Sequence, residues 1–126
     1  TFESINRIVD SFPPAQQGQV RAQLAFVLKG VVTQQLIPHI SGTGRVLVAE
    51  VMVCTPAISA TIRDDKIHQI YGLMQAGQKY GMQTMNQALL TAVKNRQISK
   101  NEALVRSTDP AELSQMLGKQ VIGDRI

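Results

Sequence analysis

The sequence predicts an α+β fold in which a β-hairpin follows a long helix and precedes a bundle of short helices. Three observations predict this class. Apolar residues recur at helical spacing before residue 32, and two runs of strand-forming residues then surround a glycine-containing turn. Residues typical of helix N-caps recur through the second half of the chain. The chain has 126 residues, of which 44% are hydrophobic, enough for one compact core. Aromatic residues make up only 4%, so that core must be aliphatic and rich in methionine.

The first two helices are predicted from their apolar spacing. Residues 4–12 place apolar side chains on one face, and the proline pair at 13–14 ends that helix. A longer helix is predicted from Ala15, with an apolar stripe formed by Val20, Leu24, Val27, Leu28 and Val31. Arg21 is assigned to the polar side of this helix, and Gly30 lies inside the pattern.

A β-hairpin is predicted next, from Thr33–Ile40 and Arg45–Cys54 around the turn at residues 41–44. Valine occurs on both faces of its second strand, which predicts burial on both sides or nearly so.

Helical signals fill the remainder of the chain. Thr55 and Pro56 are an N-cap and a first-turn proline for a helix whose inner face holds Ile58 and Ile62. Another helix is predicted after Asp65, ending near Gly81. A third, capped by Thr84, has an apolar face formed by Met85, Ala88, Leu89, Ala92 and Val93.

Two capping boxes, Ser99 with Glu102 and Asp109 with Glu112, each predict a further short helix. From Gly118 the sequence has no periodicity and predicts a flexible tail over residues 118–126.

Composition indicates the cellular compartment of the chain and the charge of its partner. The single cysteine, Cys54, cannot form an internal disulfide and indicates a reducing, cytoplasmic compartment. The longest apolar run, residues 46–54, is far shorter than the roughly 20 residues that span a bilayer, so no transmembrane segment is predicted. Because the chain opens with Thr1 rather than methionine, we expect a fragment or a processed product. The formal charge of +4 favours an acidic partner without identifying one.

No complete catalytic site is predicted. Nothing matches G-x-x-x-x-G-K-[ST], and residues 42–45, G-T-G-R, lie between two strands and are interpreted as a turn. Cys54, His39 and His68 have no spacing that suggests nucleophilic or metal chemistry, and Cys54 is interpreted as a buried, inert thiol. We therefore expect no catalytic residue and no metal site in this chain.

An alternative function is a basic helical nucleic-acid-binding domain. No acidic residue occurs between Lys66 and Asn101, whereas Lys79, Lys94, Arg96 and Lys100 accumulate there beside a series of glutamines. Sparse cations and few aromatic residues argue against this alternative, so we expect no nucleic-acid partner.

Three stretches carry a family resemblance. Residues 7–13 read R-I-V-D-S-F-P, residues 57–64 read A-I-S-A-T-I-R-D, and residues 81–85 read G-M-Q-T-M. In this order, with the hairpin between them, they resemble the PilT-type retraction ATPases of twitching motility, in the type II and type IV secretion ATPase superfamily, from about Thr1 to about Leu117. The signature residues of the outer two stretches are Arg7, Asp10, Phe12, Pro13, Gly81, Met82, Gln83 and Thr84.

The resemblance implies the C-terminal section of a RecA-like ATPase domain. Residues 1–54 would end the RecA-like core, and residues 55–117 would form a helical C-terminal subdomain. The phosphate loop, ATP and Mg²⁺ would belong to an upstream core in the full-length protein. The family forms homohexamers at the cytoplasmic face of the inner membrane and couples ATP hydrolysis to pilus disassembly through platform proteins.

The middle stretch is similar to the family's A-I-R-N-L-I-R-E, the segment implied in retraction. The resemblance carries that role onto Ala57, Ile58, Ile62, Arg63 and Asp64. Ser59, Ala60 and Thr61 depart from the pattern. Relative to the family pattern, this segment lacks an arginine and an amide, and therefore a charge and several hydrogen-bond donors. Retraction and another motor role therefore both remain as alternatives.

Overall fold

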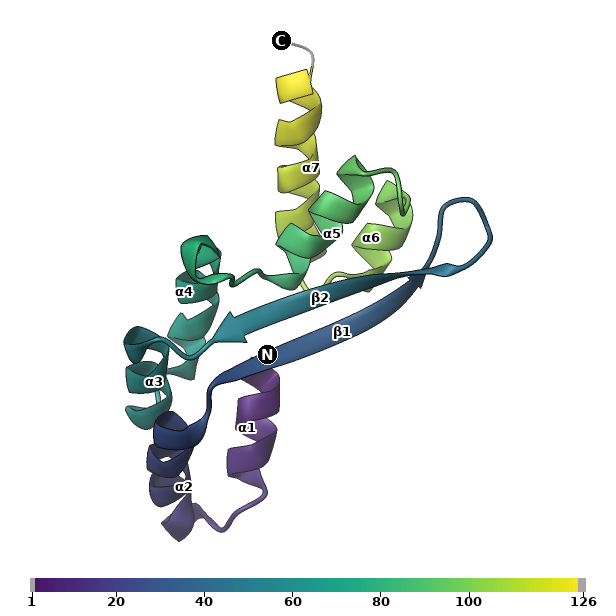
Figure 1. The fold of residues 1–126 in the computed structure, drawn as a ribbon. Helices are drawn as coiled ribbons and strands as arrows, with labels where there is room; N and C mark the ends of the chain where they lie inside the picture. Colours follow the sequence, from purple (N-terminus) through teal and green to yellow (C-terminus); the bar gives the residue numbers. More distant parts are fainter. Residues whose placement is uncertain (1, 125–126) are drawn as a thin grey trace. The chain divides into compact units, whose positions relative to one another are not determined.

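The computed structural model describes residues 2–124, and the side chains of residues 2–118. Its elements, in chain order, are α1 (Phe2–Asp10), α2 (Pro14–Val27), β1 (Gly30–Pro38), β2 (Arg45–Val53), α3 (Pro56–Arg63), the 3₁₀ turn η1 (Ile67–Gln69), α4 (Ile70–Gln75), the 3₁₀ turn η2 (Gln78–Tyr80), α5 (Met85–Lys94), α6 (Lys100–Arg106) and α7 (Pro110–Asp124) (Figure 1). The predicted order of helices around one hairpin is confirmed, but the single helix predicted between Asp65 and Gly81 is instead the short helix α4 with a 3₁₀ turn on each side.

The chain divides into two compact units, and both strands contribute to each. The first unit combines Thr1–Thr33 with Glu50–Thr84, and the second combines Gln34–Ala49 with Met85–Ile126. The chain therefore passes from one unit to the other after Thr33, after Ala49 and after Thr84. The boundaries predicted at residues 54 and 117 differ from these crossings, and the division into a motor core and a helical subdomain stays a prediction.

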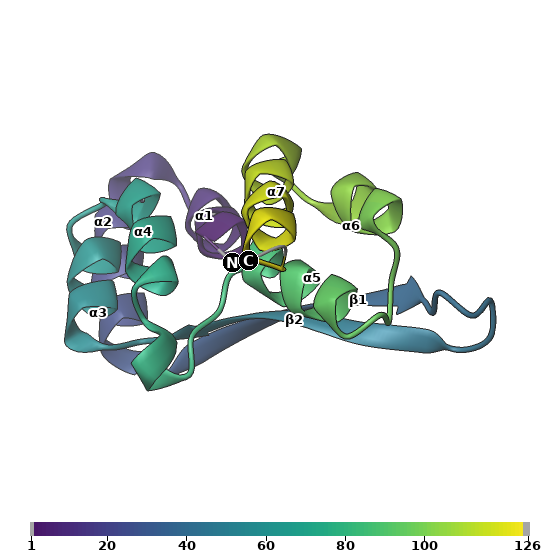
Figure 2. The same cartoon turned by 90° about the horizontal axis from the view of Figure 1, so that it is seen from above.

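The first unit is built on a core that α1, α3, α4 and β2 share. Helix α2 packs along α3, which in turn contacts α4, and these helices lie side by side in Figure 2. The buried members of this core are Ile5, Met52, Ile58, Ile62, Ile67, Ile70, Met74 and Met82. Aliphatic and methionine side chains form it, as the composition predicted.

The second unit has its own core beneath α5, α6 and α7, which contact one another. Its buried members are Ile37, Val46, Val48, Met85, Ala88, Leu89, Ala92, Ile98, Ala103, Leu113 and Leu117. The helix caps predicted at Ser99 and Asp109 are both present. The amide of Glu102 donates to Ser99 Oγ over 3.1 Å, and the amide of Glu112 donates to Asp109 Oδ1 over 3.2 Å.

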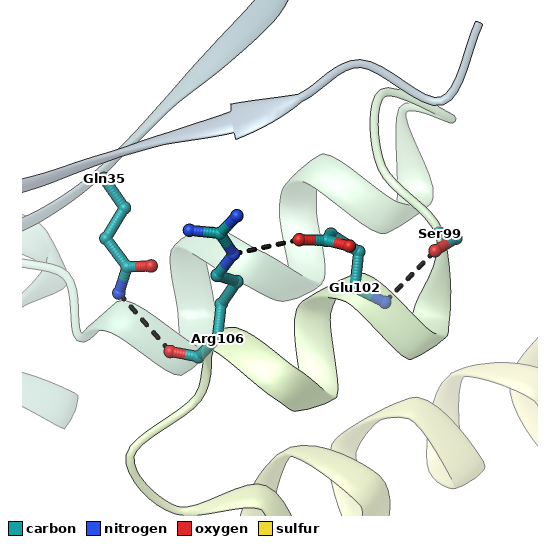
Figure 3. A network of polar contacts seen from close by, with 4 residues as sticks. All are labelled: Gln35, Ser99, Glu102 and Arg106. Atoms are coloured by element: carbon teal, nitrogen blue, oxygen red, sulfur yellow. Dashed lines mark hydrogen bonds and ion pairs between the residues drawn. The ribbon is translucent and has the colours of Figure 1, made fainter. Parts of the chain in front are cut away.

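Polar contacts connect strand β1 to α6 in the second unit (Figure 3). Gln35 Nε2 donates to the carbonyl oxygen of Arg106 over 3.3 Å, and Arg106 Nε donates to Glu102 Oε1 over 2.9 Å. Because Ser99 caps the first turn of the same helix, both ends of α6 are fixed by hydrogen bonds.

The hairpin is antiparallel, as predicted, but the burial of β2 differs from the prediction. Val46 and Val48 are buried, whereas Leu47 is 56% exposed. This alternation means that helices cover only one face of the strand over these residues. The prediction of burial on both faces is therefore wrong for this part of β2.

The long helix is shorter than predicted. Helix α2 ends at Val27, Leu28 takes an extended conformation, and strand β1 begins at Gly30. A Cβ atom on Gly30 would lie 2.8 Å from the carbonyl oxygen of Met52 across the hairpin. Glycine is therefore needed for close strand pairing, and its position inside an apparent helical pattern was misleading.

The C-terminal helix continues beyond the predicted end of periodic structure. Backbone from Gly118 to Asp124 is helical, whereas the sequence predicted an irregular tail from Gly118. Residues 125–126 lie outside the described residues, and flexibility of this end stays a prediction. Among the described residues, none of the helices combines the length and apolar character that crossing a membrane requires.

Candidate functional site around helix α3

Helix α3 carries most of residues 57–64, the stretch to which the family resemblance assigns a role in retraction and which is hereafter the motor segment. Local sequence sets the start of this helix. Thr55 Oγ1 accepts a hydrogen bond from the amide of Ile58 over 3.4 Å, and Pro56 occupies the first turn. Both features were predicted. Ile58 and Ile62, one turn apart, are fully buried in the core of the first unit. Their part in this segment is to hold the helix against that core.

The C-terminal end of α3 presents charge to solvent. Arg63 Nε donates to Asp64 Oδ1 over 3.1 Å, and both side chains are exposed. This hydrogen bond lowers the pKa of the Asp64 carboxyl and raises the pKa of Arg63. Both groups are therefore charged at neutral pH. Ala57, at the opposite end of the helix, is also exposed.

Between these ends lie the residues that depart from the family pattern. Ser59 and Ala60 are half-buried, and Thr61 is 8% exposed. Thr61 Oγ1 donates to the carbonyl oxygen of Ile58 over 2.6 Å, so its hydroxyl is satisfied within the helix. The structure therefore accommodates the threonine without an unsatisfied polar group.

Helix α3 ends in a motif that normally uses glycine. The amide of Asp65 donates to the carbonyl oxygen of Ile62 over 3.4 Å, and that of Lys66 donates to Thr61 over 2.8 Å. This is the Schellman pattern, and Asp65 takes its left-handed position with a φ of 56°. Arg21 Nε, from α2, lies 3.2 Å from Asp65 Oδ1.

The sequence did not reveal the contact between Arg21 and Asp65. Arg21 was assigned to the polar side of α2, yet its side chain is only 19% exposed. The available signal was its position between Val20 and Leu24 in the apolar stripe, because the aliphatic stem of an arginine can pack in such a place.

The outer signature stretches occupy different parts of the first unit. In the first stretch Arg7 and Asp10 are exposed on α1, Phe12 is 41% exposed, and Pro13 is the N-cap residue of α2. The buried residues of α1 are instead Ile5 and Val9. This stretch therefore contributes the packing of α1 and the start of α2.

The third stretch reaches the same core as α3. Met82 packs in the cluster that holds Ile58 and Ile62. Gly81 has a φ of 85° and ends η2, as only glycine does without strain. Gln83 exchanges two backbone hydrogen bonds with Val51 of β2, over 2.9 and 3.0 Å, and Thr84 is buried.

The best candidate for a phosphate-binding loop, residues 42–45, joins two strands, and two of its amides already donate within the turn. Gly42 donates to the carbonyl oxygen of His39 over 2.9 Å, and Thr43 donates to Ser41 Oγ over 3.4 Å. No cluster of three metal-ligating side chains occurs among the described residues.

Cys54 is half-buried, and burial raises the pKa of its thiol, while Lys29 nearby opposes this shift. A raised pKa leaves less thiolate at neutral pH. We therefore expect iodoacetamide to label Cys54 in the folded chain at pH 7.5 more slowly than a cysteine in an unstructured peptide, with the rate rising in guanidinium. Equal rates before and after unfolding would contradict the interpretation of Cys54 as an inert thiol.

The cap of α3 gives a second test. Thr55→Ala should lower the free energy of unfolding by about 1 kcal/mol, because the amide of Ile58 then loses its side-chain acceptor. Thr55→Ser keeps the hydroxyl and should lie close to the unmodified chain. Guanidinium unfolding followed by circular dichroism measures both, and equal losses in the two variants would rule out the capping role.

Known proteins provide an independent comparison. The chain is 40% identical over 108 residues to the pilus retraction ATPase PilT of Pseudomonas aeruginosa, covering 86% of this chain and 31% of the relative. It is 37% identical over 112 residues to a twitching motility protein of Neisseria gonorrhoeae, covering 89% and 30%. The crystal structure of the retraction motor PilT with bound ADP matches with a TM-score of 0.81 and 43% identity, covering 91% of this chain and 32% of that one. No protein-family model matches.

The fold is that of the C-terminal part of an ATPase, as the match to the PilT structure shows. More narrowly, the chain is homologous over most of its length to PilT-type retraction ATPases, and the resemblance predicted from the sequence is confirmed. It spans about a third of the length of these relatives. The comparisons give no support to the nucleic-acid-binding alternative, whose cations also fall in both compact units.

Proposed function

We propose that this chain is the C-terminal section of a hexameric type IV pilus retraction motor, and that it relays ATP-driven motion to pilus disassembly. The observation that carries the proposal is the construction of α3. Ile58 and Ile62 anchor the helix in the core, while Arg63 and Asp64 extend a charged pair into solvent. Such a helix can transmit movement of the unit to a partner that contacts its exposed end.

In this proposal, the portion of the motor beyond the matched third binds ATP and Mg²⁺. That portion supplies the phosphate loop and the metal ligands. The helices of the first unit would respond as one body, because they pack on one shared core. This chain would therefore receive mechanical work without performing the hydrolysis.

The proposed partners are the upstream ATPase core, neighbouring subunits of the homohexamer and the pilus platform proteins. The names of the relatives, a retraction ATPase and a twitching motility protein, support this assignment. The proposed place of action is the cytoplasmic face of the inner membrane, where the motor would act as a peripheral protein.

A chimeric motor tests the proposal. The matching 108-residue region of Pseudomonas aeruginosa PilT is replaced by the corresponding part of this chain and expressed in a strain that lacks its own PilT. We expect a hexamer that hydrolyses ATP and restores twitching. Adding Arg63→Ala and Asp64→Ala should abolish twitching while ATP turnover continues. A chimera that hydrolyses ATP as a hexamer but supports no retraction would contradict the proposed function.

The purified 126-residue chain provides the complementary test. Because the phosphate loop is proposed to lie in the portion of the motor beyond the matched third, we expect no ATP turnover above that of a buffer control. ATP turnover that copurifies with the protein through successive steps would show that this chain hydrolyses ATP. That result would overturn the proposal that hydrolysis belongs to another part of the motor.

A further inference from the structure

We propose that Arg21 is a positioning residue for the motor segment: through its ion pair with Asp65 it fixes the direction in which the exposed end of α3 is presented. The inference rests on the proposed function, because it assigns to a residue on α2 a part in the relay. Arg21 belongs to none of the stretches that resemble the retraction ATPases.

The ion pair lies directly beside the charged end of α3. Asp65 directly follows Arg63 and Asp64, the charged end of α3. A shift of the turn at Asp65 would therefore act on the backbone next to these two side chains. Arg21 reaches this turn from α2, the helix that packs along α3, and its Nε lies 3.2 Å from Asp65 Oδ1. The pair thus connects the end of α3 to a neighbouring helix.

The two partners of the ion pair are buried to different extents. The Arg21 side chain is 19% exposed, whereas that of Asp65 is 64% exposed. The Nε atom of Arg21 is shielded from solvent, and no acceptor among the described residues meets it with hydrogen-bond geometry. The contact with Asp65 is therefore an ion pair rather than a hydrogen bond. Asp65 nonetheless supplies a negative charge beside the Arg21 side chain, and its exposed carboxylate keeps the pair in contact with solvent.

The backbone at Asp65 does not itself require an aspartate. Its left-handed conformation, with a φ of 56°, is one that glycine adopts without steric penalty. For the backbone conformation of this turn, glycine would be more favourable than aspartate. Its carboxylate, however, can pair with Arg21. The side chain at this position therefore serves the interaction with α2 rather than the geometry of the helix end.

A purely stabilising role is the competing interpretation. Ion pairs with one exposed partner contribute little to stability, so removing this one should barely change the melting temperature. Orientation is different, because a small angular change at the end of a helix displaces the groups that a partner must contact. The test therefore separates motor output from stability and from ATP turnover.

Two variants of the chimeric motor remove the pair from opposite sides. Arg21→Met keeps the packing of the stem and removes the charge, while Asp65→Gly removes the carboxylate and keeps the left-handed turn. We expect twitching to fall about fivefold in both, with ATP turnover, hexamer assembly and melting temperature unchanged. Arg106→Met is the matched control, because it removes the ion pair with Glu102 in the second unit, and twitching should be unchanged.

A charge exchange provides the rescue. Arg21→Asp combined with Asp65→Arg should recover at least about half of the twitching. An arginine is acceptable at this backbone position, because Arg96 occupies the corresponding place after α5 with a φ of 57°. Unchanged twitching in both single variants would overturn the proposal. So would a loss of twitching that follows a proportionate loss of ATP turnover and melting temperature.

Amide exchange in the 126-residue chain keeps the inference testable if the chimera itself supports no retraction. The amide of Lys66 donates to the carbonyl oxygen of Thr61 and closes the end of α3. Arg21→Met should accelerate its hydrogen exchange about fivefold, while amides in α5 keep their rates. No local acceleration would overturn the positioning role independently of the proposed function.

Discussion

Replacing Ile62 with alanine should lower the free energy of unfolding of the first unit by about 2–5 kcal/mol. Ile62 is fully buried, and it packs with Ile58, Met52 and Met82 in the shared core. Truncation removes buried methyl groups and leaves a cavity that close-packed neighbours fill only in part. Ile62→Val, which removes one methylene, should lose about 0.5–1.5 kcal/mol.

Tyrosine fluorescence during guanidinium unfolding measures this effect selectively. The chain has no tryptophan, and its tyrosines, Tyr71 and Tyr80, both belong to the first unit. Arg63→Met, only one residue away, should leave the transition unchanged because that side chain is exposed. If Ile62→Ala were as stable as the unmodified chain, α3 could not be anchored as described.

The second large effect is expected at Asn86, which is 3% exposed at the start of α5. Its Nδ2 donates to the carbonyl oxygen of Asp109 over 3.1 Å and to Glu112 Oε1 over 3.0 Å, and its Oδ1 accepts from Ser107 Oγ over 2.5 Å. This amide therefore connects α5 to the start of α7. Asn86→Leu should lower the free energy of unfolding of the second unit by about 2–4 kcal/mol, because it leaves these partly buried partners without their amide.

Asn86→Asp adds a dependence on pH to the same site. A carboxylate there would face the acceptor oxygens of Asp109 and Glu112, so the pKa of the introduced group would be raised in the folded state. The folded state then favours the protonated form, and the variant should gain stability relative to the unmodified chain as pH falls through the carboxyl range. Thermal unfolding at pH 7 and pH 4.5 measures this. A deficit that is the same at both pH values would contradict the assignment of these acceptors.

The capping residues and the inner face of α3 could be predicted from the sequence because both depend on local patterns. Thr55, Ser99 and Asp109 accept hydrogen bonds from amides three residues ahead, as their positions indicated. Ile58 and Ile62 are one turn apart on a short helix, so their common burial followed from periodicity alone.

Features that depend on contacts distant in sequence could not be predicted. The apolar stripe of α2 continued through Gly30 into Val31, and only the approach of Met52 across the hairpin shows why a strand begins there. The ion pair of Arg21 with Asp65 joins residues from different helices, and an arginine beside an apolar stripe looks like an ordinary surface residue. For the same reason, the exposed face of β2 at Leu47 was missed.

The three chain crossings at residues 33, 49 and 84 have a genetic consequence. Neither unit corresponds to an uninterrupted stretch of codons, so no single deletion, stop codon or fusion point can separate them cleanly. A stop codon after Thr84 would remove α5, α6 and α7, and would expose Ile37, Val46 and Val48 to solvent. The hairpin would then present an apolar face that is prone to aggregation. In the proposed motor, recombination between genomes would therefore preserve function only when it carries the hairpin together with the helices on both sides of it.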